Sequence, residues 1–270
     1  MPDPSPPPSQ PLRVITWNVN SIRTRLERVL GLLERHRPDL LCLQETKVTD
    51  EEFPLEVFRE RGWEVALHGQ KTYNGVALIS RRPVEGVRRG FPGNPLPEQA
   101  RVISGELGGV RVVNLYVVNG EAVGSEKYPA KLAWLDRLAD WLETEHDPGS
   151  PLLLVGDFNI APDDRDVHDP ALWRGKVLVS DPERERLGRI LGWGTRDLLR
   201  LKTEEGGIYS WWDYRMGAFA RGWGLRIDLA LGTAPVAERV AAVTIDREER
   251  KPTMAEGKPS DHAPVVVDLA

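Results

Sequence analysis

Residues 152–159 read LLLVGDFN, an apolar run followed by two polar residues that flank a phenylalanine. A short apolar run of this kind is typical of a buried β-strand. Asp157 and Asn159 are two positions apart, so their side chains face the same way in an extended segment. The stretch therefore predicts a core strand that ends in a carboxylate and an amide. Taken alone, it also fits an ordinary turn capped by the aspartate.

The same pattern recurs along the chain. The other runs predicted as buried strands are VITW (14–17), LLCLQ (40–44), GVALIS (75–80), VRVVNLYVV (110–118), LRIDLALG (225–232) and APVVVDL (263–269). Amphipathic helices are predicted over residues 22–37, 131–143 and 182–191, where leucines and other apolar residues return on one helical face. Strands mixed with helices indicate an α/β layered fold.

We expect a single domain over residues 12–270, because no Pro- or Gly-rich linker divides the chain. Residues 1–11 are rich in Pro and Ser and predict a flexible tail. The run from Pro162 to Lys176 is polar and longer than an ordinary connection, which favours a functional surface loop over a packed element.

The composition is that of a globular protein, with 40% hydrophobic residues, nine tryptophans and a net charge of −5. This charge argues against a protein that coats nucleic acid through bulk positive charge. A local basic strip remains compatible with it, and Arg81, Arg82, Arg88 and Arg89 are its candidates, with solvated loop charge as the alternative.

Cys42 is the only cysteine, so neither an intrachain disulfide nor a cysteine-rich metal site is expected. No apolar stretch reaches the length of about 18 residues that a membrane span needs, and the N-terminus lacks an apolar signal region. We therefore expect a reducing compartment, the cytoplasm.

Residues able to bind metal or phosphate recur at the ends of the predicted strands. They are Asn18, Glu45, Asp157, Asn159, Asp228, Asp261 and His262. A carboxylate against an apolar strand is costly unless it is paired or bound to metal. Hard divalent cations prefer oxygen ligands, and phosphodiester hydrolysis needs an oriented water and neutralised oxyanion charge. The set therefore points to a metal-dependent phosphodiesterase.

Several of these residues have simpler interpretations that stay open. Glu45 could pair with Lys47, and Asp228 could be a structural partner of Arg226 or Arg215. His262 is the histidine best placed for proton transfer, with Asp228 as the group that orients it. The other histidines, which lie in polar surroundings and are expected at the surface, are His36, His68, His146 and His168.

Seven segments resemble, in order, those of the bacterial exonuclease III family in the endonuclease/exonuclease/phosphatase superfamily. They are TWNVNSIRTR, LLCLQETK, NLYVVNGE, GDFNIAPDDRDVHDP, SWWDYR, GLRIDLALG and KPSDHAP. The resemblance, from about Leu12 to Leu269, implies a four-layer α/β sandwich, with two mixed β-sheets face to face, helices outside and the site at one rim. It also implies a nuclease that cleaves 5′ to abasic sites in duplex DNA, degrades strands from the 3′ end and cleans 3′ ends.

The resemblance further implies the cofactor and the roles of the metal and water ligands. Mg²⁺ is the implied ion, with Mn²⁺ as the alternative. Glu45 would bind the metal with Asn18 and Asp261 close by. Asp157 and Asn159 would position the attacking water. We expect the protein to be a monomer and to associate with the nucleoid.

The remaining implied roles concern the substrate. Tyr116 and Asn119 would contact the target phosphate, and His262, held by Asp228, would stabilise or protonate a phosphate oxygen. An apolar pocket would take the base-free sugar, formed by Trp211, Leu225 and Ile227. Core packing is the alternative for the tryptophan.

Two segments depart from the family pattern. VVNG at 117–120 stands where a Pro and often a Gln are usual, and GGIY at 206–209 precedes SWWDYR. Either departure bears on the balance between endonuclease and exonuclease activity. The rival functions are a lipid or inositol-phosphate phosphodiesterase of the same fold, against which SWWDYR argues, and a DNA-binding module without catalysis, against which the complete set of catalytic positions argues.

Overall fold

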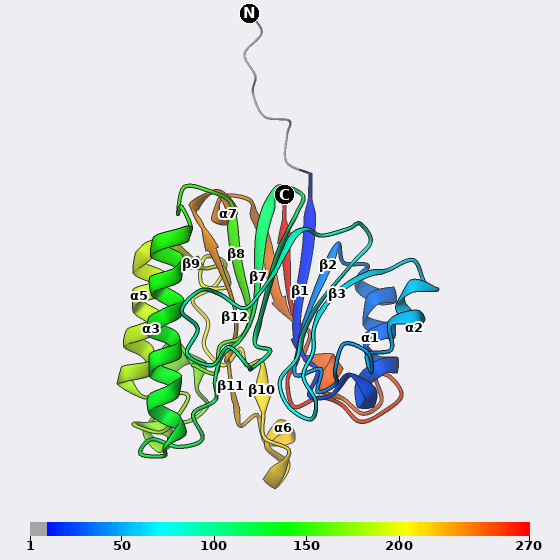
Figure 1. Ribbon diagram of the computed structural model, residues 1–270. Coiled ribbons are helices and arrows are strands. Elements are labelled where there is room, and N and C mark those ends of the chain that lie inside the picture. Colours follow the sequence, from blue (N-terminus) through cyan, green and yellow to red (C-terminus); the bar gives the residue numbers. More distant parts are fainter. Residues whose placement is uncertain (1–9) are drawn as a thin grey trace, which may run out of the picture.

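Two six-stranded β-sheets lie face to face at the centre of the computed structural model, which describes residues 10–270 (Figure 1). The first sheet has the order β13-β14-β1-β2-β4-β3, with bounds Val240–Ile245, Val265–Leu269, Leu12–Asn18, Leu40–Gln44, Val76–Ser80 and Glu64–His68. The second has the order β5-β6-β7-β8-β12-β9, with bounds Glu85–Arg89, Val102–Leu107, Val110–Tyr116, Leu152–Asp157, Asp228–Thr233 and Thr195–Asp197. Both sheets are mixed, because β1 pairs with β2, and β7 with β8, in parallel.

Helices cover the outer face of each sheet (Figure 1). α1 (Ile22–His36) and α2 (Leu55–Arg59) pack on the first sheet, and α3 (Lys127–Glu145) and α5 (Asp181–Gly194) pack on the second. Three apolar cores separate the four layers, and the central core, with Val14, Cys42 and Val112, lies between the sheets. The predicted four-layer α/β sandwich is confirmed.

Short elements complete the described chain. They are η1 (Asp164–Asp166), α4 (Pro170–Trp173), β10 (Trp211–Trp212), η2 (Arg215–Gly217), α6 (Ala218–Arg221), β11 (Gly224–Leu225), α7 (Ala234–Ala237) and η3 (Arg247–Arg250). β10 and β11 form a separate antiparallel pair below the two sheets in Figure 1. No helix within residues 10–270 is long and apolar enough to cross a membrane.

The strand directions gather the predicted site residues at one rim. Asn18 pairs with Gln44 at the ends of β1 and β2, and Tyr116 pairs with Asp157 at the ends of β7 and β8. β12 runs antiparallel to β8, so its first residue, Asp228, also pairs with Asp157. β14 is antiparallel to β1, so the segment before β14, which carries Asp261 and His262, lies at the same rim.

The structure corrects three details of the predicted elements. LRIDLALG is two strands, since β11 ends at Leu225 and β12 starts at Asp228, because the chain changes sheets between them. The strand predicted over 110–118 ends at Tyr116. The segment 162–176 contains η1 and α4 and buries Asp166 and Val167, so it is partly packed.

Two predictions about surface groups are also corrected. Arg81 and Arg82 follow β4, whose end pairs with the start of β2, so they lie at the rim opposite the site. The four histidines expected at the surface are half-buried, and His36, for example, binds Asp246 at 2.9 Å. Residues 1–9 of the predicted tail lie outside the described residues.

Candidate active site

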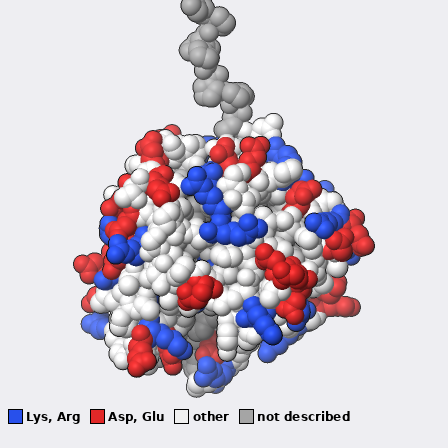
Figure 2. All heavy atoms as spheres, in the orientation of Figure 1, with Lys and Arg blue, Asp and Glu red and all other residues white. Residues whose placement is uncertain are grey.

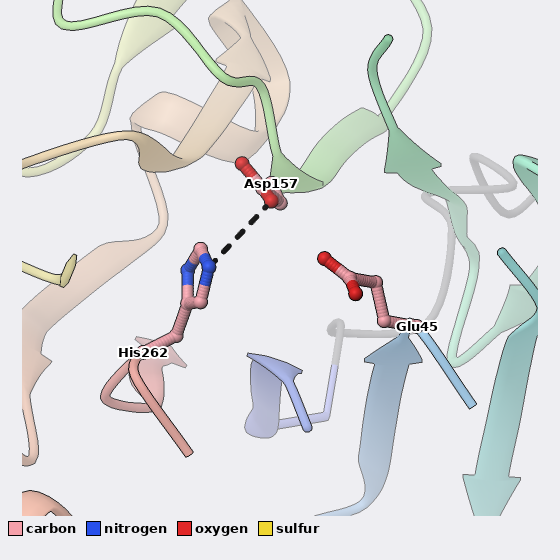
Figure 3. Close-up of side chains that lie close together, drawn as sticks. All are labelled: Glu45, Asp157 and His262. Atoms are coloured by element: carbon pink, nitrogen blue, oxygen red, sulfur yellow. Dashed lines mark ion pairs between the residues drawn. The ribbon is translucent and has the colours of Figure 1, made fainter. Parts of the chain in front are cut away.

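Glu45, Asp157 and His262 converge at the rim between the sheets (Figure 3). Each offers one ligand atom, and these atoms all lie within 4.8 Å of one another. Glu45 follows β2, Asp157 ends β8 and His262 precedes β14, so three separate strands position them. The two carboxylates at this spacing are hard oxygen donors of the kind that fit a divalent cation, and the imidazole stands beside them.

Asn18 connects the two sheets beneath this cluster. It is the last residue of β1 and is fully buried. Its side-chain Nδ2 donates to Glu45 Oε1 at 2.8 Å and to Asp157 Oδ2 at 2.9 Å. Its Oδ1 accepts from the backbone N–H of Asn20 at 3.0 Å. One amide therefore holds both carboxylates toward the same point.

Glu45 also forms the ion pair with Lys47 that the sequence left open, at 2.8 Å. Burial raises the pKa of Glu45, but the charge of Lys47 and the hydrogen bond from Asn18 outweigh it, so the pKa lies below its usual value. Glu45 has φ +53° and Lys47 φ +58°, a left-handed conformation that is uncommon outside glycine. The turn after β2 is thus strained where the metal-ligand candidate sits.

His262 is fixed by a chain of hydrogen bonds through Asp228. Its Nδ1 lies 2.8 Å from Asp228 Oδ2, and its Nε2 lies 3.8 Å from Asp157 Oδ2. Ser210 donates its hydroxyl to the same Asp228 oxygen at 2.6 Å. The alternative partners predicted for Asp228 are wrong, since Arg226 binds Asp166 and Asp197, and Arg215 binds Asp213.

Burial and charge shift the pKa values of both groups that face each other across this site. Burial raises the pKa of Asp157 to about 7, with Asp228 and Glu45 adding to the shift and His262 opposing it. Burial lowers the pKa of His262, but the charges of Asp228 and Asp157 outweigh it and raise the value to about 10. The imidazole is therefore held as a cation at neutral pH.

The other predicted water and phosphate ligands lie beside Asp157. Asn159, at φ +51°, receives a hydrogen bond on Oδ1 from Asn119 Nδ2 at 2.9 Å. Its backbone N–H donates to Asp157 Oδ1 at 2.9 Å. Tyr116 is stacked under the guanidinium of Arg101, 4.7 Å from the ring centre. Burial, with Glu45 and Asp157, raises the pKa of the Tyr116 phenol well above its usual value.

A groove of about 1000 Å³ opens from this cluster. Glu45, Tyr116 and Asn119 are among its lining residues, and Lys47 and Arg101 add positive charge to the lining. On the face drawn in Figure 2, acidic and basic side chains are interspersed, in keeping with the net charge. Positive charge for a phosphate is thus provided locally in the groove.

Asp261 and the predicted apolar pocket lie on the other side of His262. Asp261 accepts from Asn20 Nδ2 at 2.9 Å and from Trp211 Nε1 at 3.1 Å. Its carboxylate is not among the three mutually close groups found in the described residues. Trp211 packs against one buried apolar cluster with Leu225 and Ile227, which are 0% and 1% exposed. Only the tryptophan presents surface to the site.

Some contributors to the site carried no clear signal in the sequence. Asn20 joins Lys47 Nζ at 2.6 Å to the Asp261 carboxylate, and Ser210 supports Asp228. Arg101, the residue just before β6, covers Tyr116. Asn20 stands next to a predicted strand end and just before a predicted helix, where a polar residue is ordinarily a turn residue or a helix cap. Ser210 and Arg101 follow no recognisable pattern of spacing.

The family model for the endonuclease/exonuclease/phosphatase family matches residues 15–262. The chain belongs to this family. It is 37% identical to exodeoxyribonuclease III of Haemophilus influenzae, over 94% of this chain and 98% of that protein.

Solved structures agree with this membership. The 3′ phosphatase NExo from Neisseria, bound to a product DNA hairpin, superimposes with a TM-score of 0.91 and 41% identity, covering 96% of this chain and 99% of that one. An AP endonuclease from Archaeoglobus fulgidus superimposes with a TM-score of 0.88 and 40% identity, covering 96% of this chain and 99% of that one. The predicted resemblance to the exonuclease III family is confirmed, and the chain is a DNA-repair nuclease.

Proposed function

We propose that this family member is a Mg²⁺-dependent phosphodiesterase that cleaves duplex DNA 5′ to abasic sites and removes nucleotides or blocking groups from 3′ ends. The observation that carries the proposal is the convergence of Glu45, Asp157 and His262 at one rim, beside the bonded pair Asn119 and Asn159. The product in each case would be a 3′-hydroxyl end.

Glu45 would hold the ion, with Asn18 and Asp261 close by and Asp157 beside it. Bound there, Mg²⁺ would supply neutralisation of the charge that develops on the phosphate and its leaving oxygen. Mn²⁺ is the alternative ion. Hard cations prefer oxygen donors such as the Glu45 carboxylate, and the left-handed turn presents this carboxylate to the site, which supports Glu45 as the ligand.

Asp157 and Asn159 would hold the attacking water. An aspartate with the ordinary pKa of about 3.9 is a weak base at neutral pH. Burial raises the pKa of Asp157 to about 7, which suits a group that accepts a proton from water. His262, charged and oriented by Asp228, would stabilise a phosphate oxygen or protonate it. The shifted pKa values of the two groups therefore support Asp157, rather than His262, as the base.

Tyr116 and Asn119 would bind the non-bridging phosphate oxygens. A phenol with a raised pKa keeps its proton and can donate a hydrogen bond. Trp211, Leu225 and Ile227 would take a base-free sugar, which costs least to extrude because no base remains to unpair. Since Leu225 and Ile227 are covered, this role requires the cluster to open.

Timed digestion of three labelled duplexes tests the proposal. One carries an internal abasic site, one a blunt 3′ end and one a 3′ phosphate. We expect cleavage of all three with Mg²⁺, none in excess chelator, and strong loss in Asp157→Asn and His262→Asn. Full activity in chelator, or wild-type rates in both variants, would contradict it.

The same assay separates the rival functions. Hydrolysis of sphingomyelin or inositol phosphates at rates above those on DNA would favour a phosphodiesterase for lipid or inositol substrates. Tight DNA binding without any cleavage would favour a non-catalytic module. We also propose a monomer that works in the cytoplasm, associated with the nucleoid, and a solution mass near 30.3 kDa would support the monomer.

A further inference from the structure

Lys131 is a fully buried lysine for which the proposed reaction has no direct use. It lies in the first half of α3, and its side chain is 0% exposed. A buried ammonium is costly unless each of its N–H groups finds an acceptor. Burial lowers the pKa of Lys131, with the charges of Glu183 and Asp157 opposing the shift. Its partners therefore explain why it is there.

The three donors of this ammonium have three acceptors. Nζ donates to the main-chain carbonyl of Asn159 at 2.7 Å and to that of Asn119 at 3.1 Å. The third acceptor is the Glu183 carboxylate, with which it forms a buried ion pair. One charge thus joins the loop after β7, the loop after β8 and the start of α5.

The two carbonyls belong to the residues proposed to contact the water and the phosphate. Asn159 is in the left-handed conformation, which asparagine adopts more readily than most residues other than glycine. That conformation is held from both sides, because its N–H donates to Asp157 and its carbonyl accepts from Lys131. The Asn119 side chain then donates to Asn159 Oδ1 at 2.9 Å.

The neighbouring residues are shaped around the lysine. A Cβ at Gly120 would lie 3.0 Å from Lys131 Cδ, so the glycine of the VVNG segment lets the loop approach the lysine stem. Glu183 accepts from the backbone N–H of Leu178 and of Ser180, both at 3.0 Å, which fixes the acid independently of the lysine. Glu183 in α5 therefore fixes the position of the Lys131 ammonium.

We propose that Lys131 is the positioning residue for Asn119 and Asn159, holding the main-chain carbonyls of both with one buried ammonium so that their side chains stay paired at the reaction centre. Lysine suits this task because its compact ammonium directs three donors, whereas the planar fork of arginine does not match three separate acceptors. The inference rests on the proposed function for the roles of the two asparagines.

The test compares Lys131→Met/Glu183→Gln with Glu183→Gln alone, so that neither variant leaves a buried carboxylate facing an apolar side chain. Leu138→Ala, two turns further along α3, is the control for lost stability, since Leu138 is fully buried in the apolar core. Kinetics are measured on a 3′-phosphate duplex with Mg²⁺, at a temperature where all variants are folded.

We expect kcat of the double variant to fall at least tenfold relative to Glu183→Gln, with KM changed less than threefold and Leu138→Ala close to the wild type. In an Asn159→Ala background the same replacement should cost less than threefold, because the side chain that Lys131 positions is gone. An unchanged kcat, or an equal loss in both backgrounds, would overturn the inference.

A second measurement does not depend on activity. With ¹⁵N-labelled asparagine, the side-chain amide signals of Asn119 and Asn159 should shift in the double variant while that of Asn114 stays in place. If the wild type cleaves no duplex, the proposed function fails and these signals alone decide the role of Lys131. Unchanged Asn119 and Asn159 signals would refute it.

Discussion

Hydrogen bonds hold both the ring and the main chain of His262. Its ring binds Asp228, and its main-chain carbonyl accepts from Trp17 Nε1 at 3.0 Å. Its backbone N–H donates to the hydroxyl of Ser260, two residues earlier in the chain, at 3.2 Å. The ring therefore has one orientation, and its charge is set by the carboxylate behind it.

Asp228→Asn should lower kcat on duplex DNA by about 10²–10³-fold, because the imidazole loses the charge that keeps it cationic and oriented. KM should change little. Asp213→Asn is the matched control, since Asp213 pairs with Arg215 away from His262. Steady-state kinetics on one labelled duplex decide the matter, and equal rates for the two variants would exclude the role given to Asp228.

At this scale the sequence predicted residue types better than contacts. Glu45, Asp157 and His262 were identified from their places at strand ends, and they do meet. The bridging role of Asn18 was not predictable, because it depends on the distance between two sheets. Lys131 gave no signal either, since a lysine within an amphipathic helix is ordinarily solvated.

β8 depends on a glycine just before its catalytic end. Gly156 has φ +138°, and a Cβ there would lie 1.9 Å from the carbonyl oxygen of Leu115 on the neighbouring strand β7. The close approach brings the ends of β7 and β8 together, and with them Tyr116 and Asp157. The glycine in LLLVGDFN is therefore a requirement of the backbone.

Gly156→Ala should lower the free energy of unfolding by about 2 kcal/mol or more, through backbone strain and the clash. Gly188→Ala is the control, because Gly188 lies within α5 with no atom within 4 Å of an added Cβ. Its helix should gain roughly 0.5–1 kcal/mol. Urea unfolding measures both, and a neutral result for Gly156→Ala would contradict the steric argument.

The end of α1 is joined to the turn after β13 by His36 and Asp246. The hydrogen bond from His36 lowers the pKa of Asp246, with the charges of His36 and Arg35 adding to it. A carboxylate whose pKa is lower in the folded state stabilises the fold above its unfolded pKa of about 3.9, and this contribution disappears as the pH falls through the folded pKa.

Asp246→Asn should therefore cost roughly 0.5–1 kcal/mol at pH 7, as expected for a partly exposed pair. Between about pH 5 and about pH 2 the difference from the wild type should shrink, as the pH falls through the lowered pKa of Asp246. Denaturant unfolding across this range provides the measurement. A difference that grows from about pH 5 to about pH 2 would show that the sign is wrong.

Element boundaries were predictable where apolar periodicity decided them, as for α1 and β8. The break between β11 and β12 was not, because Arg226 there binds Asp166 and Asp197 from distant segments. Edge strands such as β5, with exposed charged residues, also lack the apolar pattern that identified the others. Tertiary contacts, not local propensity, set these boundaries.

Across the whole molecule, the two sheets meet through apolar residues but share polar contacts near the rim. Gln44 Nε2 in the first sheet donates to Asn114 Oδ1 in the second at 2.6 Å. Cys42 lies in the same layer with 0% exposure, and burial raises the pKa of its thiol. The thiol is therefore neutral and covered in the native state.

Cys42 should react with a thiol reagent only when the sandwich opens. We expect labelling in native buffer to be slower than in the unfolded chain by about 10³-fold or more, in line with ordinary domain stability. Because Cys42 is the only cysteine, mass spectrometry follows the reaction without ambiguity. Rapid labelling of the native protein would contradict the buried position.

The layer order was predictable only through the family resemblance, since composition and periodicity give α/β without an arrangement. The opposite-rim position of Arg81 and Arg82 shows the limit, because it follows from strand direction alone. The site lies at the ends of β1, β2, β7 and β8. Its central property, catalysis that depends on a divalent cation held at Glu45, can be tested directly.

The most direct test measures cleavage of one 3′-phosphate duplex at increasing Mg²⁺ by the wild type, Glu45→Gln and Glu126→Gln. Glu126 is an exposed carboxylate that lines the same groove and serves as the matched control. We predict that Glu45→Gln loses about 10²-fold or more in rate at any given Mg²⁺ concentration, while Glu126→Gln stays within twofold of the wild type. Wild-type cleavage by Glu45→Gln at the same Mg²⁺ concentration would contradict the central claim.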